Sequence, residues 1–205
     1  MSKIGIMGGT FNPIHKAHIA MAYAALEQSS LDRIWFMPSK KPPHKSHKDL
    51  LSEEVRKKMI QLAIQDEPAF ELSEFELRRQ GTTYTAETLQ LLKEDYPGDA
   101  FYFIMGGDSF FQIENWYLPE QIMSLCTIIA ISRDGVGQEK MMTQAAYLER
   151  KYQALVQLVH MPDIPISSSL LRKLLKEPDR NREKILPFLP AQVYNYIIEN
   201  TLYEE

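Results

Sequence analysis

Two histidines near the start of the chain have the types and spacing for chemistry on phosphate groups. An apolar run is followed by the sequence GGTFNPIHKAH at residues 8–18. Gly8 and Gly9 lack side chains, so backbone N–H groups in this turn can approach a phosphate chain closely. His15 and His18 are three residues apart and are expected on one face of the helix that follows. The pattern therefore predicts a phosphate-binding site.

The same spacing excludes two common phosphate-binding motifs. The segment contains neither Gly-x-Gly-x-x-Gly nor Gly-x-x-x-x-Gly-Lys-Ser/Thr, so it supports neither a dinucleotide-binding turn nor a P-loop. A zinc site on His15 and His18 is the metal alternative. It is disfavoured because helical metal pairs usually lie four residues apart, and no nearby cysteine or acidic residue completes the ligand set.

Residues 8–18 resemble the H-x-G-H signature of the nucleotidyltransferase superfamily and, within it, the bacterial nicotinate-nucleotide adenylyltransferases. Ala17 stands where this family has glycine. The resemblance implies that His15 and His18 donate hydrogen bonds to the α- and β-phosphates of ATP. It also implies an ATP-binding role for four residues before them, namely Gly8, Gly9, Thr10 and Phe11.

A second segment, PISSSLLR at residues 165–172, follows an apolar run late in the chain. Serines at a helix start usually cap the helix, and Arg172 one turn later offers a planar fork for phosphate. The segment resembles the I-S-S-T-x-I-R motif of the same superfamily, with Ser169 in place of threonine and Leu171 in place of isoleucine. The resemblance implies that the ATP phosphates are bound by Arg172 together with Ser167, Ser168 and Ser169.

A third segment, IMGGD at residues 104–108, ends the most convincing central strand. From the residues alone, its glycines form a turn at the strand end, and Asp108 either caps the next helix or contacts a ligand. The resemblance favours a ligand, because the G-x-D of this family binds the ribose of adenosine. Gly106 and Asp108 are therefore expected at the adenosine site.

The acceptor site is expected around Trp116, an aromatic residue with polar neighbours, whereas Trp35 lies within an apolar strand and is expected to be packed. The resemblance implies that Trp116 stacks on the pyridine ring of the nucleotide substrate. It also implies that main-chain N–H groups near Thr85 and Tyr117 bind the carboxylate of that substrate.

Two further runs match family patterns: YTAET at residues 84–88, which begins with Tyr84, and PPHK at 42–45. For the second run, the resemblance implies that His44 binds the substrate and that Lys45 binds the leaving pyrophosphate. Arg56 and Arg133 are additional candidates for phosphate or helix contacts, with Arg133 carried as a substrate-binding candidate. Solvated charge is the favoured interpretation for both arginines.

Short apolar runs must supply the strands that position these residues. They alternate with longer segments of helical period, which predicts a parallel sheet with crossover helices. Ligands of such sheets collect outside the carboxyl ends of the strands. The expected fold is α/β, a Rossmann-like open parallel sheet with helices on both faces, in a single domain 1–205 with a small helical C-terminal extension at about 167–205. The expected strands are 3–7, 33–37, 100–105, 127–131 and 158–161. Ser52 and Thr85 are each expected to cap the start of a helix.

Composition limits the classes of protein. The chain has 205 residues and a net charge of −4, which argues against nucleic-acid binding, although residues 40–48 gather four lysines and two histidines. The single cysteine, Cys126, lies in an apolar run and is expected to be an inert core thiol. No run is long enough to span a membrane and no signal peptide is evident, so a cytoplasmic location is expected. A homodimer stays open.

The resemblance implies transfer of the adenylyl group of ATP, with Mg²⁺, to nicotinate mononucleotide. The acceptor phosphate is already anionic, so the protein is expected to align reactants and neutralise charge rather than supply a base. Nicotinamide mononucleotide or phosphopantetheine is the alternative acceptor. A nucleotide-binding regulator without turnover is the alternative of another class.

Overall fold

The computed structural model describes residues 1–40, 50–133 and 137–204. These residues form a six-stranded sheet in the order β3-β2-β1-β4-β5-β6, in which every neighbouring pair is parallel. This order confirms the predicted open, Rossmann-like sheet. The strands are β1 (Lys3–Gly9), β2 (Arg33–Pro38), β3 (Phe70–Leu72), β4 (Ala100–Gly106), β5 (Thr127–Arg133) and β6 (Leu155–Met161).

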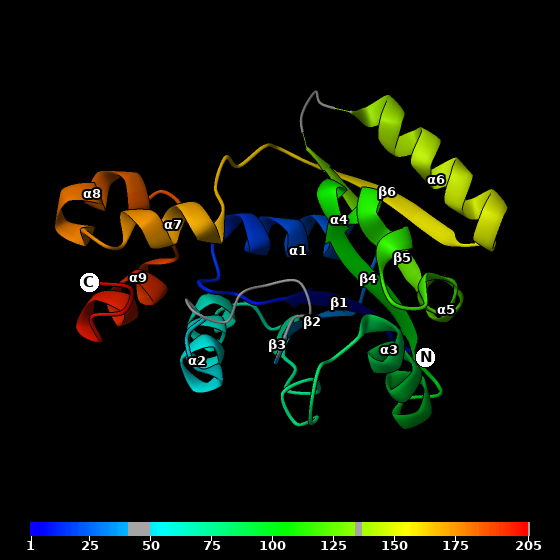
Figure 1. Ribbon diagram of the computed structural model, residues 1–205, viewed down its shortest axis with the longest axis horizontal. Coiled ribbons are helices and arrows are strands. Elements are labelled where there is room, and N and C mark those ends of the chain that lie inside the picture. The colour runs from blue at the N-terminus through cyan, green and yellow to red at the C-terminus, as the bar shows by residue number, and fades with distance from the viewer. Residues whose placement is uncertain (41–49, 134–136, 205) are drawn as a thin grey trace.

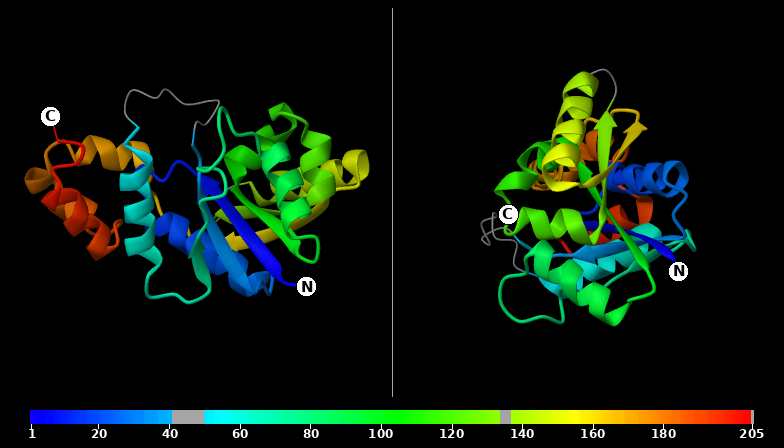
Figure 2. Two further views of the ribbon diagram at one scale, coloured as in Figure 1. Left: turned by 90° about the horizontal axis from the view of Figure 1, so that it is seen from below. Right: turned by 90° about the vertical axis from the view of Figure 1, so that its right-hand side faces the viewer.

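Helices cover both faces of the sheet, as Figures 1 and 2 show. The α1 and α2 side chains share one buried cluster, and those of α3 to α6 share the cluster on the opposite face. Successive residues of β1 supply both clusters, since Ile6 belongs to one and Met7 to the other. The helices of the two layers are α1 (Lys16–Gln28), α2 (Glu53–Ile64), α3 (Thr85–Asp95), α4 (Gly107–Gln112), the 3₁₀ turn η1 (Ile113–Asn115), α5 (Pro119–Leu125) and α6 (Gln138–Tyr152).

The C-terminal part of the chain is helical, as the sequence predicts from Ser167 onward. It consists of α7 (Ser168–Leu174), α8 (Pro178–Ile185) and α9 (Ala191–Glu199), separated near the prolines that divide the segment. Figures 1 and 2 place these helices at the end of the molecule opposite α6. Their apolar residues, including Leu171 and Val193, join the cluster under α1 and α2.

Several local predictions differ from the structure. The strand β3 was not predicted, because three residues are too few to show a period. The last strand begins at Leu155 rather than at residue 158, since its exposed edge gives it a mixed pattern. Thr85 does not cap α3. The carbonyl of Tyr84 accepts the first hydrogen bond of that helix, from the N–H of Thr88, so Tyr84 is the N-cap residue.

Other predictions are confirmed. The hydroxyl of Ser52 accepts from the backbone N–H of Val55 and caps α2. Trp35 is buried, and its indole N–H donates to Glu71. Cys126 is buried and unpaired, and burial raises the pKa of its thiol to about 12. Among the described residues, no helix is both long and apolar enough to cross a membrane.

Candidate active site

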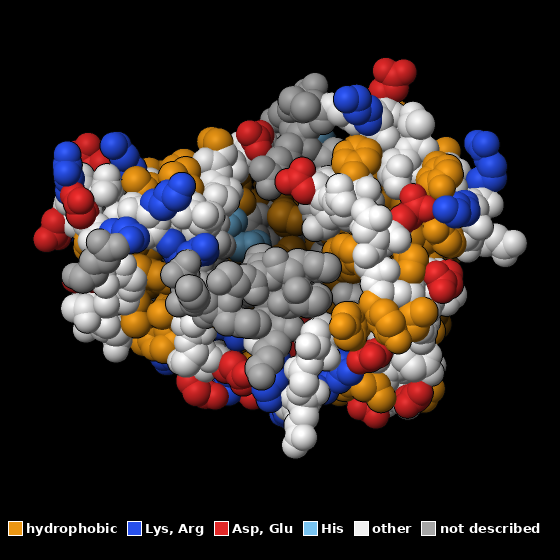
Figure 3. Space-filling model, in the orientation of Figure 1, with side chains coloured by type: hydrophobic (Ala, Val, Ile, Leu, Met, Phe, Trp, Pro, Cys, Tyr) orange, Lys and Arg blue, Asp and Glu red, His pale blue; other side chains and the backbone are white. Residues whose placement is uncertain are grey.

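A cavity of about 810 Å³ opens at the carboxyl ends of the central strands. Its walls include the carboxyl-terminal parts of β1, β2, β4 and β5, at Gly9, Met37, Gly106 and Ser132. The neighbouring strands β1 and β4 are the place where the strand order reverses, which is where open α/β sheets bind their ligands. This volume lies within the range of roughly 300–1,000 Å³ of small-molecule and cofactor sites. Figure 3 shows the hollow, with histidine side chains visible inside it.

The two predicted histidines lie against each other at the start of α1. Their rings are stacked, with centroids 3.7 Å apart and planes inclined by 24°. His15 is the N-cap residue of α1 and is buried, whereas His18 lies in the first turn and lines the cavity. The edge of Phe11 contacts the His18 ring, with centroids 5.2 Å apart. Of these two histidines, His18 is the one that lines the cavity, and the buried His15 ring packs against it.

A backbone hydrogen bond indicates which ring nitrogen of His18 accepts and which can donate. The N–H of His15 donates to Nδ1 of His18 at 3.2 Å. An accepting ring nitrogen carries no proton, so His18 bears its proton on Nε2. With this bond in place, the Nε2–H is the donor that the His18 ring can offer to a ligand.

The loop between the glycines and the histidines is held by helix α7, more than 150 positions away. Arg172 donates through Nη1 to the backbone oxygen of Asn12 at 3.0 Å, and the Ser168 hydroxyl donates to that of Pro13 at 2.9 Å. The Ser167 hydroxyl accepts from the N–H of Leu170 and caps α7. The fold therefore brings the first and last predicted phosphate motifs into direct contact.

Arg56 lies beneath the same loop, and the prediction of solvated charge for it is wrong. Its side chain is 1% exposed, and its guanidinium donates to the backbone oxygens of Thr10 at 2.9 Å and of Leu51 at 3.1 Å. Burial lowers the pKa of this guanidinium. An arginine pKa is so high that the group stays charged, and it adds a fixed positive charge under the glycine turn.

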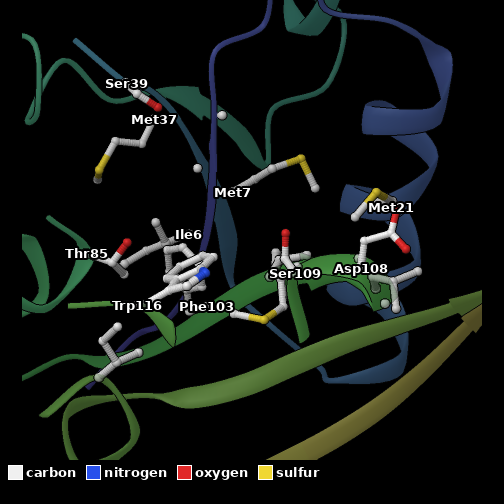
Figure 4. Close-up of a pocket in the computed structure, with 18 of the residues that line it drawn as sticks. Ile6, Met7, Met21, Met37, Ser39, Thr85, Phe103, Asp108, Ser109 and Trp116 are labelled. Atoms are coloured by element: carbon white, nitrogen blue, oxygen red, sulfur yellow. The ribbon is translucent and has the colours of Figure 1, made fainter. Parts of the chain in front are cut away.

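The cavity has two ends. In Figure 4, Thr85 and Trp116 lie at one end, and Met21 and Asp108 lie at the other. The Trp116 ring meets Phe103 edge-on, with centroids 6.0 Å apart and planes at 88°. Gly8, Gly9 and His18 also line the cavity. One cavity thus joins an aromatic end to an end with a carboxylate.

A network of polar side chains supports the aromatic end. The Glu76 carboxylate lines the cavity and accepts from the hydroxyls of Thr88 at 2.9 Å and Thr83 at 3.0 Å. Arg79 donates to the Thr88 hydroxyl at 2.9 Å and pairs with Glu87 at 2.7 Å. Burial raises the pKa of Glu76, although both hydroxyls and the charge of Arg79 oppose the shift. These contacts tie the segment before α3 to the first turn of that helix.

The predicted site residues fall into three groups. The cavity is lined by Gly8, Gly9, Thr10, His18, Tyr84, Thr85, Gly106, Asp108, Trp116 and Tyr117. Beside it, in its supporting loop, core or neighbouring helix, lie Phe11, His15, Ser167, Ser168, Ser169 and Arg172. The Phe11 side chain is buried in the core and limits any ligand contact to its backbone. His44, Lys45 and the side chain of Arg133 lie outside the described parts of the structure.

Sequence reasoning missed the apolar walls and one carboxylate. Ile6, Met7 and Phe103 line the cavity from the ends of the strands, and Met21 reaches it from α1. Their strand or helix period indicates only burial, because a core wall and a cavity wall have the same pattern. Glu76 gave no signal either, since nothing in a polar loop marks one acidic residue as enclosed.

Comparison with known proteins agrees with this geometry. Residues 6–174 match the family described as cytidylyltransferase-like. The chain is 45% identical over 203 residues to a probable nicotinate-nucleotide adenylyltransferase of Lachnoclostridium phytofermentans, covering 99% of this chain and 100% of that protein. It is 37% identical over 204 residues to the nicotinate-nucleotide adenylyltransferase of Bacillus subtilis strain 168, covering 100% of both.

A solved structure shares the whole fold. The nicotinic acid mononucleotide adenylyltransferase of Plasmodium falciparum, complexed with NaAD, superposes with a TM-score of 0.81 at 26% identity, covering 99% of this chain and 98% of that chain. The same protein complexed with APC gives a TM-score of 0.80 at 25% identity, with the same coverage. This chain therefore belongs to the nicotinate-nucleotide adenylyltransferases, within the cytidylyltransferase-like family of nucleotidyltransferases.

Proposed function

We propose that this enzyme transfers the adenylyl group of ATP to nicotinate mononucleotide, forming nicotinate adenine dinucleotide and pyrophosphate in NAD biosynthesis. The observation that carries the proposal is the single cavity that joins the Asp108 end to the Trp116 end past the glycine turn and His18. A nucleoside triphosphate and a mononucleotide can lie in it with their phosphates meeting at the centre. Relatives of this chain carry the name of the same activity.

The residue types fit direct, in-line displacement at the α-phosphorus of ATP. The acceptor phosphate oxygen forms the new bond to that phosphorus while the bond to the bridging oxygen of pyrophosphate breaks. Both partners are anions, so the protein must mainly align them and offset their charge. His18 donates from Nε2 to the reacting phosphates, and Arg172 and Lys45 bind the departing pyrophosphate. No side chain forms a covalent intermediate.

The adenosine of ATP occupies the other end of the cavity. Gly106 ends β4 and lines the cavity together with Asp108. Asp108, two residues later, offers carboxylate oxygens to the ribose hydroxyls. Ser167 caps α7 and Ser168 fixes this helix against the loop before α1, and in this way both support triphosphate binding. Ser169 is proposed as a further ATP contact.

The first turn of α3 favours an acid over an amide in the acceptor. Its N-cap residue, Tyr84, makes no side-chain cap hydrogen bond, so the backbone N–H groups that begin with Thr85 point beyond the helix. The helix dipole makes this end positive, and a carboxylate is a better partner for it than a carboxamide. Trp116 stacks on the pyridine ring, and the backbone near Tyr117 completes the carboxylate site.

Mg²⁺ enters as part of the MgATP substrate. The described residues contain no group of three or more His, Cys, Asp or Glu side chains that could hold a metal ion. Mg²⁺ commonly keeps several water ligands and binds phosphate oxygens with few protein ligands, which supports an ion carried by the triphosphate. When bound, the ion offsets phosphate charge.

We also propose that residues 1–205 work as one domain. Residues of α7, α8 and α9 belong to the same buried cluster as those of α1 and α2. The contacts of Arg172 and Ser168 with residues 12 and 13 make this helical part a piece of the phosphate site.

An acceptor panel tests the activity. The purified enzyme is given MgATP with nicotinate mononucleotide, nicotinamide mononucleotide or phosphopantetheine, and pyrophosphate release is measured. We expect the highest kcat/KM with nicotinate mononucleotide. Faster reaction with either other acceptor would reassign the substrate, and no release with any would leave a nucleotide-binding regulator. ATP chiral at the α-phosphorus tests the mechanism. We expect inversion, whereas retention would reveal an adenylylated enzyme.

A further inference from the structure

Tyr203, near the end of the chain, contacts the loop between the glycine turn of β1 and helix α1. The hydroxyl of Tyr203 donates to Oδ1 of Asn12 at 2.8 Å, across 191 positions of sequence. Asn12 is 3% exposed, and the same Oδ1 also accepts from the backbone N–H of Leu51 at 3.4 Å. The resemblance of the sequence to its family gives Tyr203 no role, and Tyr203 does not line the cavity.

Asn12 is the central residue of a loop that other elements hold by its backbone. Its own carbonyl accepts from Arg172, and the carbonyl of Thr10 accepts from Arg56. These bonds fix the main chain on either side of Phe11. The Tyr203 hydroxyl instead bonds the Asn12 side chain, and this bond is shorter than the one from the N–H of Leu51 to the same oxygen.

The turn that carries Tyr203 has an uncommon backbone conformation that neighbouring contacts hold in place. Thr201 and Tyr203 have positive φ angles of 48° and 71°, which are uncommon for residues other than glycine. The turn is nevertheless fixed, because the N–H of Leu202 donates to the carbonyl of Ile197 at 3.0 Å, and both Leu202 and Tyr203 pack against the main buried cluster. Such conformations persist where surrounding contacts determine them, often at functional sites.

Burial keeps the Tyr203 hydroxyl a hydrogen-bond donor. Burial raises the pKa of the Tyr203 hydroxyl, although the charges of Arg172 and Arg56 act in the opposite direction. The hydroxyl therefore keeps its proton at neutral pH and can donate to Asn12 throughout the working range. The same two cations that hold the loop backbone lie near enough to the ring to affect its pKa.

We propose that Tyr203 is a positioning residue for the reaction: through Asn12 it sets the loop that presents His18 and receives Arg172. The inference rests on the proposed adenylyl transfer. It concerns the phosphate groups alone, because the acceptor end of the cavity, at Thr85 and Trp116, belongs to other elements.

The test compares Tyr203→Phe with Tyr196→Phe, a control on α9 whose ring also packs against the main buried cluster. Both variants are assayed with MgATP and nicotinate mononucleotide, and their melting temperatures are measured. One hydrogen bond corresponds to a change of about three- to tenfold, so we expect Tyr203→Phe to lose that factor in kcat. The KM for nicotinate mononucleotide should stay within about twofold, and Tyr196→Phe should resemble wild type. Wild-type kcat in Tyr203→Phe, or an equal loss in Tyr196→Phe, overturns the proposal.

A double-mutant cycle with Asn12→Ala tests whether Tyr203 acts through Asn12. If it does, adding Tyr203→Phe to Asn12→Ala leaves kcat unchanged, because the acceptor of its hydrogen bond is already gone. A further loss as large as in the wild-type background contradicts the proposal. If Asn12→Ala does not fold, the KM and kcat of Tyr203→Phe decide alone. Absence of turnover in the wild-type enzyme would instead refute the proposed function. A failure of the Tyr203 proposal differs from this, because the wild-type enzyme then remains active.

Discussion

The guanidinium of Arg172 donates to the backbone oxygen of Asn12 at 3.0 Å and joins α7 to the loop before α1. A guanidinium has five N–H donors in a rigid fork, so this bond orients the group while using only one of them. The contact would couple the proposed binding of pyrophosphate by Arg172 to the shape of the loop before His18. It also brings two motifs about 150 residues apart into one region of the structure.

Replacing His18 should abolish most of the activity without unfolding the protein. The His18→Ala variant loses the Nε2–H donor, and removal of one donor to a transition-state oxyanion costs about a hundred- to a thousandfold in kcat. Single-turnover rates and circular dichroism provide the measurement. His18→Ala with unchanged kcat would remove the assigned role.

Arg172 should not be replaceable by lysine. Arg172→Lys keeps the charge but loses the planar fork that can hold the Asn12 oxygen and a phosphate together. We expect kcat/KM for ATP to fall about ten- to a hundredfold, the range for a hydrogen bond to a charged group. The matched control is Lys173→Ala, at an exposed position of the same helix, which should stay near wild type. Wild-type kcat/KM in Arg172→Lys together with a loss in Lys173→Ala would instead show that only the net charge of α7 matters.

Removing Trp116 should separate the two substrates. Stacking of an aromatic side chain on a base contributes about 1–3 kcal/mol, so Trp116→Ala should raise the KM for nicotinate mononucleotide about five- to a hundredfold. The KM for ATP should change little, because Asp108 and Met21 lie at the other end of the cavity. Steady-state kinetics with each substrate varied in turn measure both constants. Trp35→Phe is the control, since Trp35 is buried on the strand β2 and is expected to affect stability alone. A matching rise in the KM for ATP would argue against two separate ends.

Glu76 should make stability depend on pH in the direction opposite to most carboxylates. Its pKa is raised in the folded protein, so the native state binds the proton more tightly than the unfolded chain. The contribution of Glu76 to stability therefore falls as pH rises from its ordinary value near 4.5 through the raised value. Glutamine does not titrate, so Glu76→Gln should gain unfolding free energy relative to wild type across this window. Urea unfolding of both proteins at several pH values measures this difference in unfolding free energy. If Glu76→Gln instead gained stability relative to wild type as the pH falls, the pKa of Glu76 would not be raised in the folded protein.

Local patterns in the chain were enough to predict the architecture. The apolar runs at β1, β2, β4 and β5 are long and bounded by clear turns, so their existence follows from period and length. The three-residue β3 and the exposed start of β6 give no such signal, because short or edge strands bury too little of their surface. Parallel strands separated by helical segments then fix which sheet edge carries the glycine turns.

The sequence by itself determined the sheet, the helical C-terminal part and the residue types that suit phosphate, since these depend on local periodicity and spacing. Only the tertiary structure decided that Arg56 is buried under the glycine turn and that the His15 ring stacks on His18. It also decided that Glu76 lines the cavity and that Tyr203 contacts Asn12. Each of these is a contact across the chain between polar side chains. A polar residue has the same local pattern whether it faces solvent or a partner far away in sequence, and only the packing of the elements distinguishes the two.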